Sequence, residues 1–531
     1  MFESVRDSLR SKNRGQLPFA DFRRTLKREL VHLIEEKRMA SDLLFMSTYM
    51  AAITTAGVTR PEIFSYTSER IEYVPTLYIA KVEHFVKRWN YSYAEGLKIV
   101  AEKARNESLK SLLNRYANAI ESGVPDEDFL ERELETIRSV YRNTLEQGME
   151  MLKKWGDAYI ALLFSGALVA LIIMLSVAIF SPKGIEGTLT SSYMIIIIIA
   201  IFGLVTMYRA VPEDPKTHGL AERCSWEQAM IRRLERPILL ATLAATLLLL
   251  VIGANAGVIF ILIGVMVTPL GIIGFLDDGL IVGRDMDFPT FIRSLGSVMG
   301  GKGEPVTQAL ADIDRKSLEA ISPLVDAAYS KLNLGLNETA VWSRFIGESG
   351  SHYIYKYMNI FRDAIALGGS PDRIGQIVHT SMLEQVLLRE KRHMIAMGFI
   401  VLLVPMHAAM VAILMFLFSI MLTMSQAIVS VIETLGENQA ALSGGAGTVG
   451  GMASGMNMFV NFPEAAMTTY VVIIITLLTI SNILAAKIVY GGDRYILYLF
   501  TAILTLVSGF IFLVAPIIVG MFFNFPSFTG V

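Results

Sequence analysis

From residue 158 to residue 180 the chain reads AYIALLFSGALVALIIMLSVAIF, a stretch without Asp, Glu, Lys or Arg. A helix needs about 20 apolar residues to cross the hydrocarbon core of a bilayer. The stretch is therefore long enough to span a membrane. The whole chain has 531 residues, of which 53% are hydrophobic and only 18% charged. Because soluble proteins carry about 25% charged residues, the composition predicts a membrane protein.

Apolar stretches of this kind recur along the chain and predict seven membrane spans. The predicted spans are 158–180, 191–208, 238–254, 256–275, 396–423, 467–487 and 495–522. The third and fourth spans meet at Gly253, Ala254 and Asn255, so residues 238–275 form either two spans or a re-entrant hairpin. The absence of charge from both segments favours two spans.

The positions of Lys and Arg predict the orientation, because these residues resist translocation. With the N-terminus in the cytosol, only Lys183 of the 47 Lys and Arg residues lies outside. The predicted external loop 424–466 has no Lys or Arg. The predicted cytosolic loop 209–237 has six, namely Arg209, Lys216, Arg223, Arg232, Arg233 and Arg236. We expect a multi-pass protein of the cell membrane with a cytosolic N-terminus and an external C-terminus, and no signal peptide.

Two charged regions read as helical cytosolic domains. In the first, Met39, Leu43, Met46, Met50 and Ile53 recur every three or four residues, which is the period of an amphipathic helix. No alternating run is long enough for a sheet, so the predicted fold is all-α. The predicted parts are a cytosolic domain 1–157, four spans in 158–275 with the basic loop 209–237, a second cytosolic domain 276–395, and three spans in 396–531 with the glycine-rich loop 424–466.

The two cytosolic domains share a weak repeat. Residues 116–123 pair with 361–368, and residues 51–57 pair with 295–301. Each stretch reads as a helix that ends at a glycine, and in the first pair a proline then starts the next helix. Both domains run through a charged helix directly into a span. This equivalent placement indicates two homologous domains.

Motifs of catalysis are weak. Residues 296–302, GSVMGGK, have the spacing of a phosphate-binding loop, but Gly303 stands where Ser or Thr is required and the preceding residues look helical. The glycine pattern 445–450 lies in the predicted external loop. The single cysteine, Cys224, excludes disulfides and cysteine metal clusters, and the seven histidines lack metal-ligand spacing. We expect no catalytic, cofactor-binding or metal-binding residues, no cofactor and no enzymatic activity.

Polar residues leave three candidate sites. His407 lies inside the fifth span and is a candidate intramembrane polar site, although its imidazole could simply bond a carbonyl that Pro405 leaves free. The second candidate is a basic cluster, either a lipid or partner surface or a solvated face, made of Arg23, Arg24, Lys27 and Arg28. The third is a candidate docking surface for a cytosolic partner, with a solvated or lipid-facing surface as the alternative, made of Arg293, Lys302, Arg315 and Lys316.

The repeat resembles the type II secretion F-domain family, the membrane platform proteins of type II secretion and type IV pilus machines. The residues that carry the resemblance are the glycine joints at Gly57, Gly123, 301–303 and Gly368. The stretch 404–411, VPMHAAMV, is similar to the archaeal branch of the family that serves the archaellum. Four spans between the domains, rather than two, depart from the bacterial pattern and fit the archaeal one.

The resemblance implies an anchor beneath a growing filament, coupled to a hexameric cytosolic ATPase that would dock on the third candidate site. It also implies pilin-like filament subunits and membrane lipids as partners, a homodimer, and no nucleic acid. The alternatives are the platform of an adhesive pilus or secretion system, a transporter, and a membrane-anchored scaffold. A transporter would show polar residues along several spans, and the spans here carry no repeated Asp, Glu or Arg.

Overall fold

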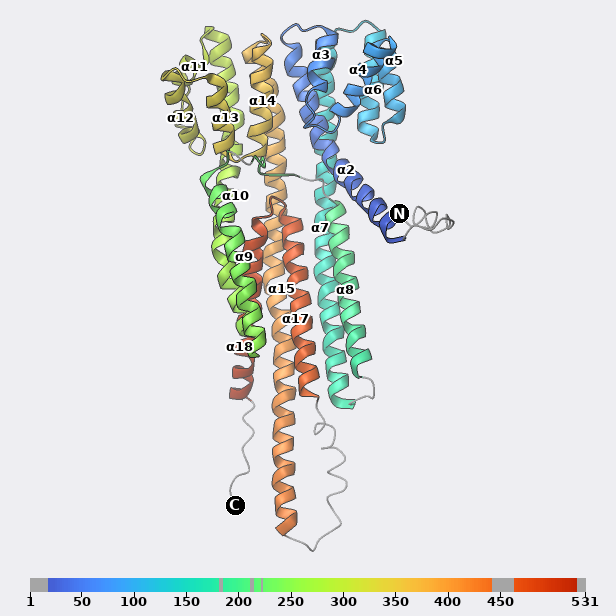
Figure 1. Cartoon of the computed structure of the whole chain (residues 1–531), viewed down its shortest axis with the longest axis vertical. Coiled ribbons are helices and arrows are strands. Elements are labelled where there is room, and N and C mark those ends of the chain that lie inside the picture. Colours follow the sequence, from blue (N-terminus) through green and yellow to red (C-terminus); the bar gives the residue numbers. More distant parts are fainter. Residues whose placement is uncertain (1–17, 181–184, 211–213, 221–222, 442–462, 523–531) are drawn as a thin grey trace. The chain divides into compact units, whose positions relative to one another are not determined.

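The structure, a computed structural model, describes residues 18–180, 185–210, 214–220, 223–441 and 463–522, and within them the side chains of 35–177, 185–210, 214–220, 223–429 and 463–522. These residues are helical almost throughout, and the described part contains no strand beyond an isolated bridge between Thr217 and Ser351 (Figure 1). The predicted all-α fold is confirmed.

Seven described helices are long and apolar enough to cross a membrane, as predicted. They are α7 (Asp126–Phe180), α8 (Ile185–Ala210), α9 (Trp226–Ile252), α10 (Ala256–Lys302), α15 (Pro371–Ala441), α17 (Glu464–Tyr490) and α18 (Ile496–Phe522).

A tight turn separates α9 from α10. Gly253 adopts φ +74°, and the Asn255 side chain accepts a 2.9 Å hydrogen bond from the Gly257 amide at the start of α10. Each helix is long enough to span the membrane alone. The structure therefore favours two spans over a re-entrant hairpin.

Two sequences of six helices repeat the same order. The first is α2 (Pro18–Thr54), α3 (Arg60–Ser68), α4 (Thr76–Trp89), α5 (Tyr93–Lys103), α6 (Glu107–Glu121) and α7. The second is α10, α11 (Val306–Asp312), α12 (Ser322–Asn333), α13 (Glu338–Ser349), α14 (His352–Ala366) and α15. In each, the last helix follows a left-handed glycine, Gly123 at φ +72° and Gly368 at φ +92°. The helix order supports the repeat that the sequence suggested.

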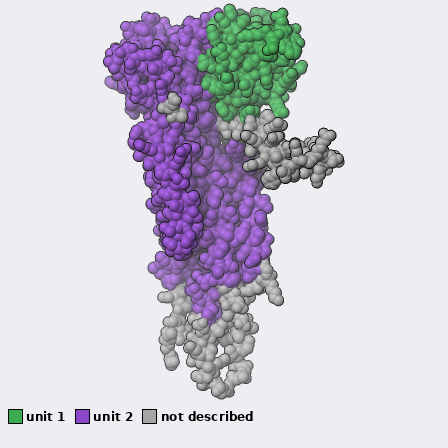
Figure 2. Space-filling view, in the orientation of Figure 1, with its two compact units in different colours: residues 1–50, 58–137 green, residues 51–57, 138–531 purple. Residues whose placement is uncertain are grey.

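The chain falls into two compact units, residues 1–50 with 58–137 (unit 1) and residues 51–57 with 138–531 (unit 2) (Figure 2). Unit 1 buries the periodic residues Met39, Leu43, Met46 and Met50. Unit 2 contains the seven spans and the second extramembrane region. These belong to one unit because α10 and α15 run from the spans into the extramembrane region without a break. The predicted boundaries at 157, 275 and 395 stay a prediction.

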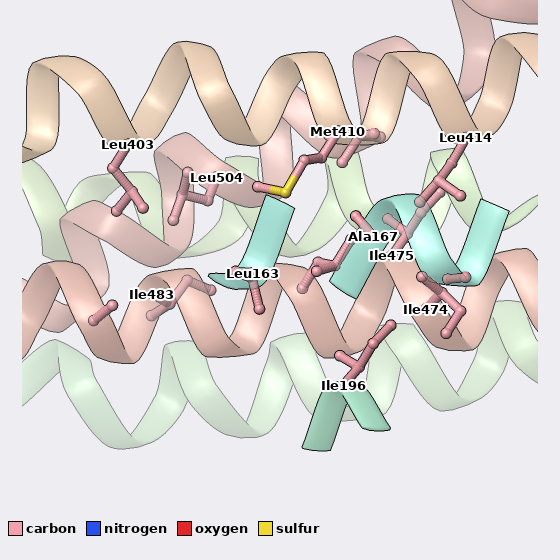
Figure 3. Packing of buried hydrophobic residues seen from close by; sticks show 14 of the residues in the cluster. Leu163, Ala167, Ile196, Leu403, Met410, Leu414, Ile474, Ile475, Ile483 and Leu504 are labelled. Carbon is pink, nitrogen blue, oxygen red and sulfur yellow. The ribbon is translucent and has the colours of Figure 1, made fainter. Parts of the chain in front are cut away.

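The spans pack around α15, α17 and α18. Buried side chains from α7, α8, α15, α17 and α18 form one apolar core, and Figure 3 shows Leu163, Ile196, Met410, Ile474 and Leu504 among them. α17 also contacts α8, and α10 contacts α9, α15 and α18. Membrane helices gain little from hydrophobic burial against each other, so close packing must hold them together.

Glycines allow α10 to approach α18 closely. Gly257, Gly264 and Gly271 follow one another at seven-residue spacing on α10. A Cβ at Gly271 would lie 2.8 Å from the Leu499 Cα, and a Cβ at Gly257 would lie 2.9 Å from the Leu513 side chain. Small residues at an interface let membrane helices approach closely.

Within the predicted external loop 424–466, α15 continues to Ala441 and α17 begins at Glu464. The prediction ended the helix where the apolar run ends. The end of an apolar run does not by itself end a helix, however. Residues 424–441 contain no proline and only one glycine, Gly436, so nothing in the sequence interrupts the helix there. The glycine-rich stretch 443–451 lies outside the described residues.

Candidate functional site

A buried ion pair joins three segments of unit 2 where α10 and α15 leave their apolar stretches. Arg389 of α15 is 6% exposed. Its Nη1 lies 2.6 Å from Asp285 Oδ2 of α10, and its Nη2 and Nε lie 2.6 and 2.8 Å from the two carboxylate oxygens of Asp214, in the segment between α8 and α9. One guanidinium therefore contacts two buried carboxylates, with bidentate geometry toward Asp214.

The start of α14 completes this cluster, which we call the Arg389 junction (Arg389, Asp214, Asp285, Ser351 and Tyr353). The Arg389 guanidinium carbon lies 3.6 Å from the centroid of the Tyr353 ring, and the Tyr353 hydroxyl donates a 2.8 Å hydrogen bond to Asp214. Ser351, the N-cap of α14, donates its hydroxyl to Asp285. The junction thus fixes α14 to α10 and α15.

Asp214 is ionised in this setting. Burial raises the pKa of its carboxyl, but the neighbouring Arg389 charge and hydrogen bonds outweigh the burial and hold the pKa well below the usual range of an aspartate. Asp214 therefore carries its charge at neutral pH, and the ion pair with Arg389 is intact there.

The segment between α8 and α9 forms a second ion pair two residues after Asp214. Lys216 is 4% exposed, and its Nζ lies 2.6 and 2.8 Å from the two carboxylate oxygens of Asp278 on α10. Tyr490, at the end of α17, donates a 2.7 Å hydrogen bond to the same carboxylate. The Lys216 carbonyl also accepts a 2.8 Å hydrogen bond from the His352 amide of α14.

A further set of hydrogen bonds continues the network toward α9. The Ser225 hydroxyl and the Gln228 amide donate 2.9 and 3.1 Å hydrogen bonds to Asp277 of α10. All three side chains are buried. The connection between α8 and α9 is therefore tied to α10, α14, α15 and α17 through side chains that water scarcely reaches.

Sequence reasoning missed the Arg389 junction. Asp214 and Lys216 read as ordinary charges of a basic loop, and Arg389 reads as part of a charged helix end. A signal was present at Asp277, Asp278 and Asp285, which follow an uncharged apolar segment within one helix. Carboxylates at such positions need partners when they are buried.

The predicted basic cluster of the second domain divides into two kinds of residue. Lys302 is paired with Asp312. Arg315 is half buried, lies 2.7 Å from Asp326 and covers the Tyr329 ring. Arg293 and Lys316 are exposed, and the described residues offer neither of them an ion pair. Of the four predicted docking cations, Arg293 and Lys316 are the two whose charge is not paired with a carboxylate among the described residues.

The N-terminal cluster Arg23, Arg24, Lys27 and Arg28 falls within α2, but its side chains lie outside the described residues. Its assignment as a lipid or partner surface stays a prediction.

His407 lies in a buried polar network between membrane helices. The Asn482 amide of α17 donates a 2.9 Å hydrogen bond to His407 Nδ1, and His407 Nε2 lies 2.8 Å from Ser508 Oγ of α18. Tyr159 of α7 donates to Asn482, and Thr479 lies 3.0 Å from Ser508. Side chains, rather than a carbonyl near Pro405, occupy both ring nitrogens.

Two glycines of the phosphate-loop pattern serve packing. Residues 296–302 are the end of α10, and a Cβ at Gly296 would collide with the carbonyl of Pro371 at the start of α15. A Cβ at Gly300 would lie 3.0 Å from Asp372. Within the described part of the chain, no group of three or more His, Cys, Asp or Glu residues could hold a metal ion.

Residues 46–174 match the family model described as type II secretion system protein F. This part of the chain is similar to a type II secretion F domain. The matched region runs from within α2 to within α7, and so covers the first of the two six-helix sequences. The resemblance found in the sequence is confirmed, and the chain is a polytopic membrane protein with a region similar to an F domain.

Two archaeal relatives align with a longer part of the chain than the family model does. The chain is 21% identical over 370 residues to flagella accessory protein J of Methanocaldococcus jannaschii, which covers 68% of this chain and 66% of that protein. It is 20% identical over 327 residues to flagella accessory protein J of Methanococcus voltae, which covers 59% of this chain and 58% of that protein. The chain thus spans somewhat less than two thirds of each relative. No solved structure matches it.

Proposed function

We propose that the chain is the membrane platform protein of an archaeal type IV pilus-like machine, and specifically of the archaellum. It anchors the base of the filament and couples a cytosolic hexameric ATPase to the assembly of pilin-like subunits. The F domain and the two relatives named flagella accessory protein J support this proposal. The N-terminus and the extramembrane parts of both six-helix sequences lie in the cytosol, and the C-terminus lies outside.

The observation that carries the proposal is the continuity of helices from the extramembrane region into the spans. α15 runs from Pro371 to Ala441 and α10 from Ala256 to Lys302, each without interruption. The Arg389 junction locks the two helices together where they leave the apolar segments. A force applied to the second cytosolic domain therefore reaches the spans through rigid elements.

The energy source is the separate ATPase, and the chain itself performs no catalysis in this account. Its docking surface on the second domain includes Arg293 and Lys316, the two exposed cations without ion pairs among the described residues. Charged patches of this kind govern encounter rate and specificity. The platform works as a homodimer among membrane lipids, and nucleic acid plays no part.

Deletion of the gene in the source organism tests the proposal. Electron microscopy should show cells without archaella, and a plasmid copy should restore them together with swimming. Archaella at wild-type number in the deletion strain would contradict the proposal. Loss of adhesion with swimming preserved would assign the chain to an adhesive pilus instead.

The docking surface is tested separately with Arg293→Glu combined with Lys316→Glu. Arg315 is left unchanged, because its bonds to Asp326 and to the Leu310 carbonyl are part of the fold. The purified double variant should bind the archaellum ATPase more weakly than wild type. The difference should shrink with added salt, since screening acts within about 10 Å at 0.1 M. Equal binding at low salt would return both cations to the role of solvated charges.

A further inference from the structure

Among the seven described spans, α9 is the one that the rest of the chain covers least. Only 6% of its most apolar segment is buried, whereas the other six spans bury 28–56% of theirs. Its buried residues Gln228, Ile231 and Thr242 share one side of the helix. Ile231 packs there against Leu270 of α10 and against Tyr495. The opposite side of α9 therefore faces the surroundings of the protein.

This outer face of α9 combines two arginines with exposed aliphatic side chains. We define it as Arg233, Arg236, Leu240, Leu247 and Val251, which lie on one side of the helix because about 3.6 residues complete a turn. Leu240, Leu247 and Val251 are 65%, 54% and 85% exposed, and both arginines are exposed as well. The outer face thus carries its charge at one end and apolar side chains beyond it.

The protein itself does not neutralise these two arginines. Neither Arg233 nor Arg236 has an ion pair within the part of the chain that the structure describes. Glu235, which lies between them in the sequence, bonds instead to Arg494 and to the hydroxyl of Tyr498. Both positive charges are therefore available to a ligand.

The length of the apolar stretch places both arginines at the level of the lipid headgroups. From Pro237 to Ile252 α9 carries no charged residue and rises about 24 Å. The hydrocarbon core of a bilayer is about 30 Å thick. A short span draws its flanking residues toward the hydrocarbon or thins the bilayer around it. Arg236 directly precedes this stretch, and Arg233 precedes it by one turn.

A lipid phosphate suits the pair of arginines by geometry and by charge. Residues three apart on a helix are neighbours on its surface, so both guanidinium groups of Arg233 and Arg236 can reach one phosphate. Guanidinium and phosphate form strong charge-assisted hydrogen bonds, often two at a time. The aliphatic part of the outer face then lies where the hydrocarbon chains of the same lipid run.

A second copy of the chain suits this face less well. A symmetric contact would bring the same cations of two copies toward each other, and like charges in contact oppose association. Between Arg233 and Ile252 the sequence has one carboxylate, Glu235, and it lies on the other side of the helix with Arg494. The outer face thus has no acidic side chain to offset the repulsion.

We propose that Arg233 and Arg236 bind the phosphate of an anionic phospholipid whose hydrocarbon chains lie along Leu240, Leu247 and Val251. The lipid covers the span that the protein leaves most open and neutralises its two free cations. The proposal requires only that α9 crosses the membrane, so it stands or falls separately from the platform function.

Lys153 and Lys154 give a matched comparison on another span. They lie on α7 just before its apolar segment, both are exposed, and neither has an ion pair among the residues described. Adjacent residues on a helix point about 100° apart, so the two ammonium groups do not converge on one phosphate. General attraction to an anionic surface acts on both pairs of cations, whereas a phosphate site exists only on α9.

The test is native mass spectrometry of the full-length protein in detergent, titrated separately with phosphatidylglycerol and phosphatidylcholine. Wild type should bind phosphatidylglycerol more tightly. Arg233→Gln with Arg236→Gln should weaken that binding by about tenfold or more, because each cation beside an anionic lipid contributes about fivefold. Arg233→Lys with Arg236→Lys should fall between the two, since lysine keeps the charge but loses the bidentate geometry. Lys153→Gln with Lys154→Gln should bind like wild type.

Four results would overturn the inference. Unchanged phosphatidylglycerol binding by Arg233→Gln with Arg236→Gln would remove the site. An equal loss in the Lys153→Gln with Lys154→Gln variant would show general attraction of cations rather than a site on α9. Glycerol phosphate that displaces phosphatidylglycerol at equal concentration would make a soluble phosphate ester the ligand. A dimer mass that the arginine variant alters, with lipid binding kept, would place a second copy on the outer face.

Discussion

Arg389 holds two carboxylates from different segments at a place that water scarcely reaches. Burying three charges is costly, and the attraction among them offsets that cost only while all partners are present. The cluster is therefore weak evidence for extra stability but strong evidence for a defined arrangement. Asp214 and Asp285 can satisfy Arg389 together only when α10, α15 and the segment after α8 are in register.

Removing this cation should be far more damaging than removing an exposed one. Arg389→Ala leaves two buried carboxylates unpaired and should lower the free energy of unfolding by about 3–5 kcal/mol. The control is Arg494→Ala, which breaks an ion pair to Glu235 whose cation is 66% exposed and should cost under about 1 kcal/mol. Thermal unfolding in detergent measures both. Equal loss in the two variants would show that the junction is not tightly held.

His407 is the second residue with a specific expectation. Both ring nitrogens bond to neighbouring helices, so the structure supports a packing role more than a ligand or proton site. His407→Leu should cost about 1–2 kcal/mol, the upper range for hydrogen bonds between membrane helices, and should leave filament number unchanged. A well-folded His407→Leu protein that fails to assemble filaments would instead establish a functional role for the imidazole.

At the residue scale the sequence predicted which side chains are polar within a span, but not what they bond. His407 stands out because its neighbours in the chain are apolar. Its partners Asn482 and Ser508 belong to other helices, and one sequence does not show which helices lie side by side. Arg389 and Asp214 escaped detection for the same reason.

At the element scale, periodicity and length were sufficient. Apolar runs of about 20 residues gave the seven spans, and the three-to-four residue spacing of Met39 to Ile53 gave a buried helix face. Helix ends were harder to predict where an apolar run ended without a glycine or proline to end the helix, as after residue 424, where α15 continues to Ala441. Glycine followed by proline predicted the joint at Gly368 correctly because that pair restricts the backbone.

The joint glycine Gly368 should resist substitution. Its φ is +92°, and a Cβ added at this position would meet no other atom within 4 Å, so only backbone strain opposes alanine. Gly368→Ala should cost about 1–2 kcal/mol. Gly301→Ala is the control, since Gly301 has the same open space without a left-handed backbone and should lose nothing. Urea unfolding compares them, and an equal response would mean that the joint relaxes freely.

At the scale of the whole molecule, the distribution of Lys and Arg fixes the expected topology. In a Cys224→Ser background, a cysteine at Ser297 on α10 should stay unlabelled by an impermeant reagent in intact cells. A cysteine at Thr188, at the start of α8, should be labelled. Both side chains are exposed in the structure, so access depends on the side of the membrane alone. The opposite labelling pattern would contradict the predicted topology and indicate the inverse orientation in the membrane.

Under the proposed function, the continuous helices α10 and α15 pass movement from the extramembrane region to the spans. The sequence predicted the repeat from glycine joints, because such joints are local. It did not predict that α10 and α15 are locked together by Arg389, because that contact joins residues more than 100 positions apart.

The most direct measurement of this account is the number of archaella on cells whose α15 is interrupted at the membrane entrance. A flexible Gly-Gly-Ser-Gly-Gly insert after Met394, which is exposed, breaks the rigid connection. The same insert in the glycine-rich stretch 443–451 serves as the control. The account predicts that the first strain makes the protein and binds the ATPase but assembles no archaella, while the control strain assembles them. Wild-type filament numbers in the first strain would contradict transmission through α15.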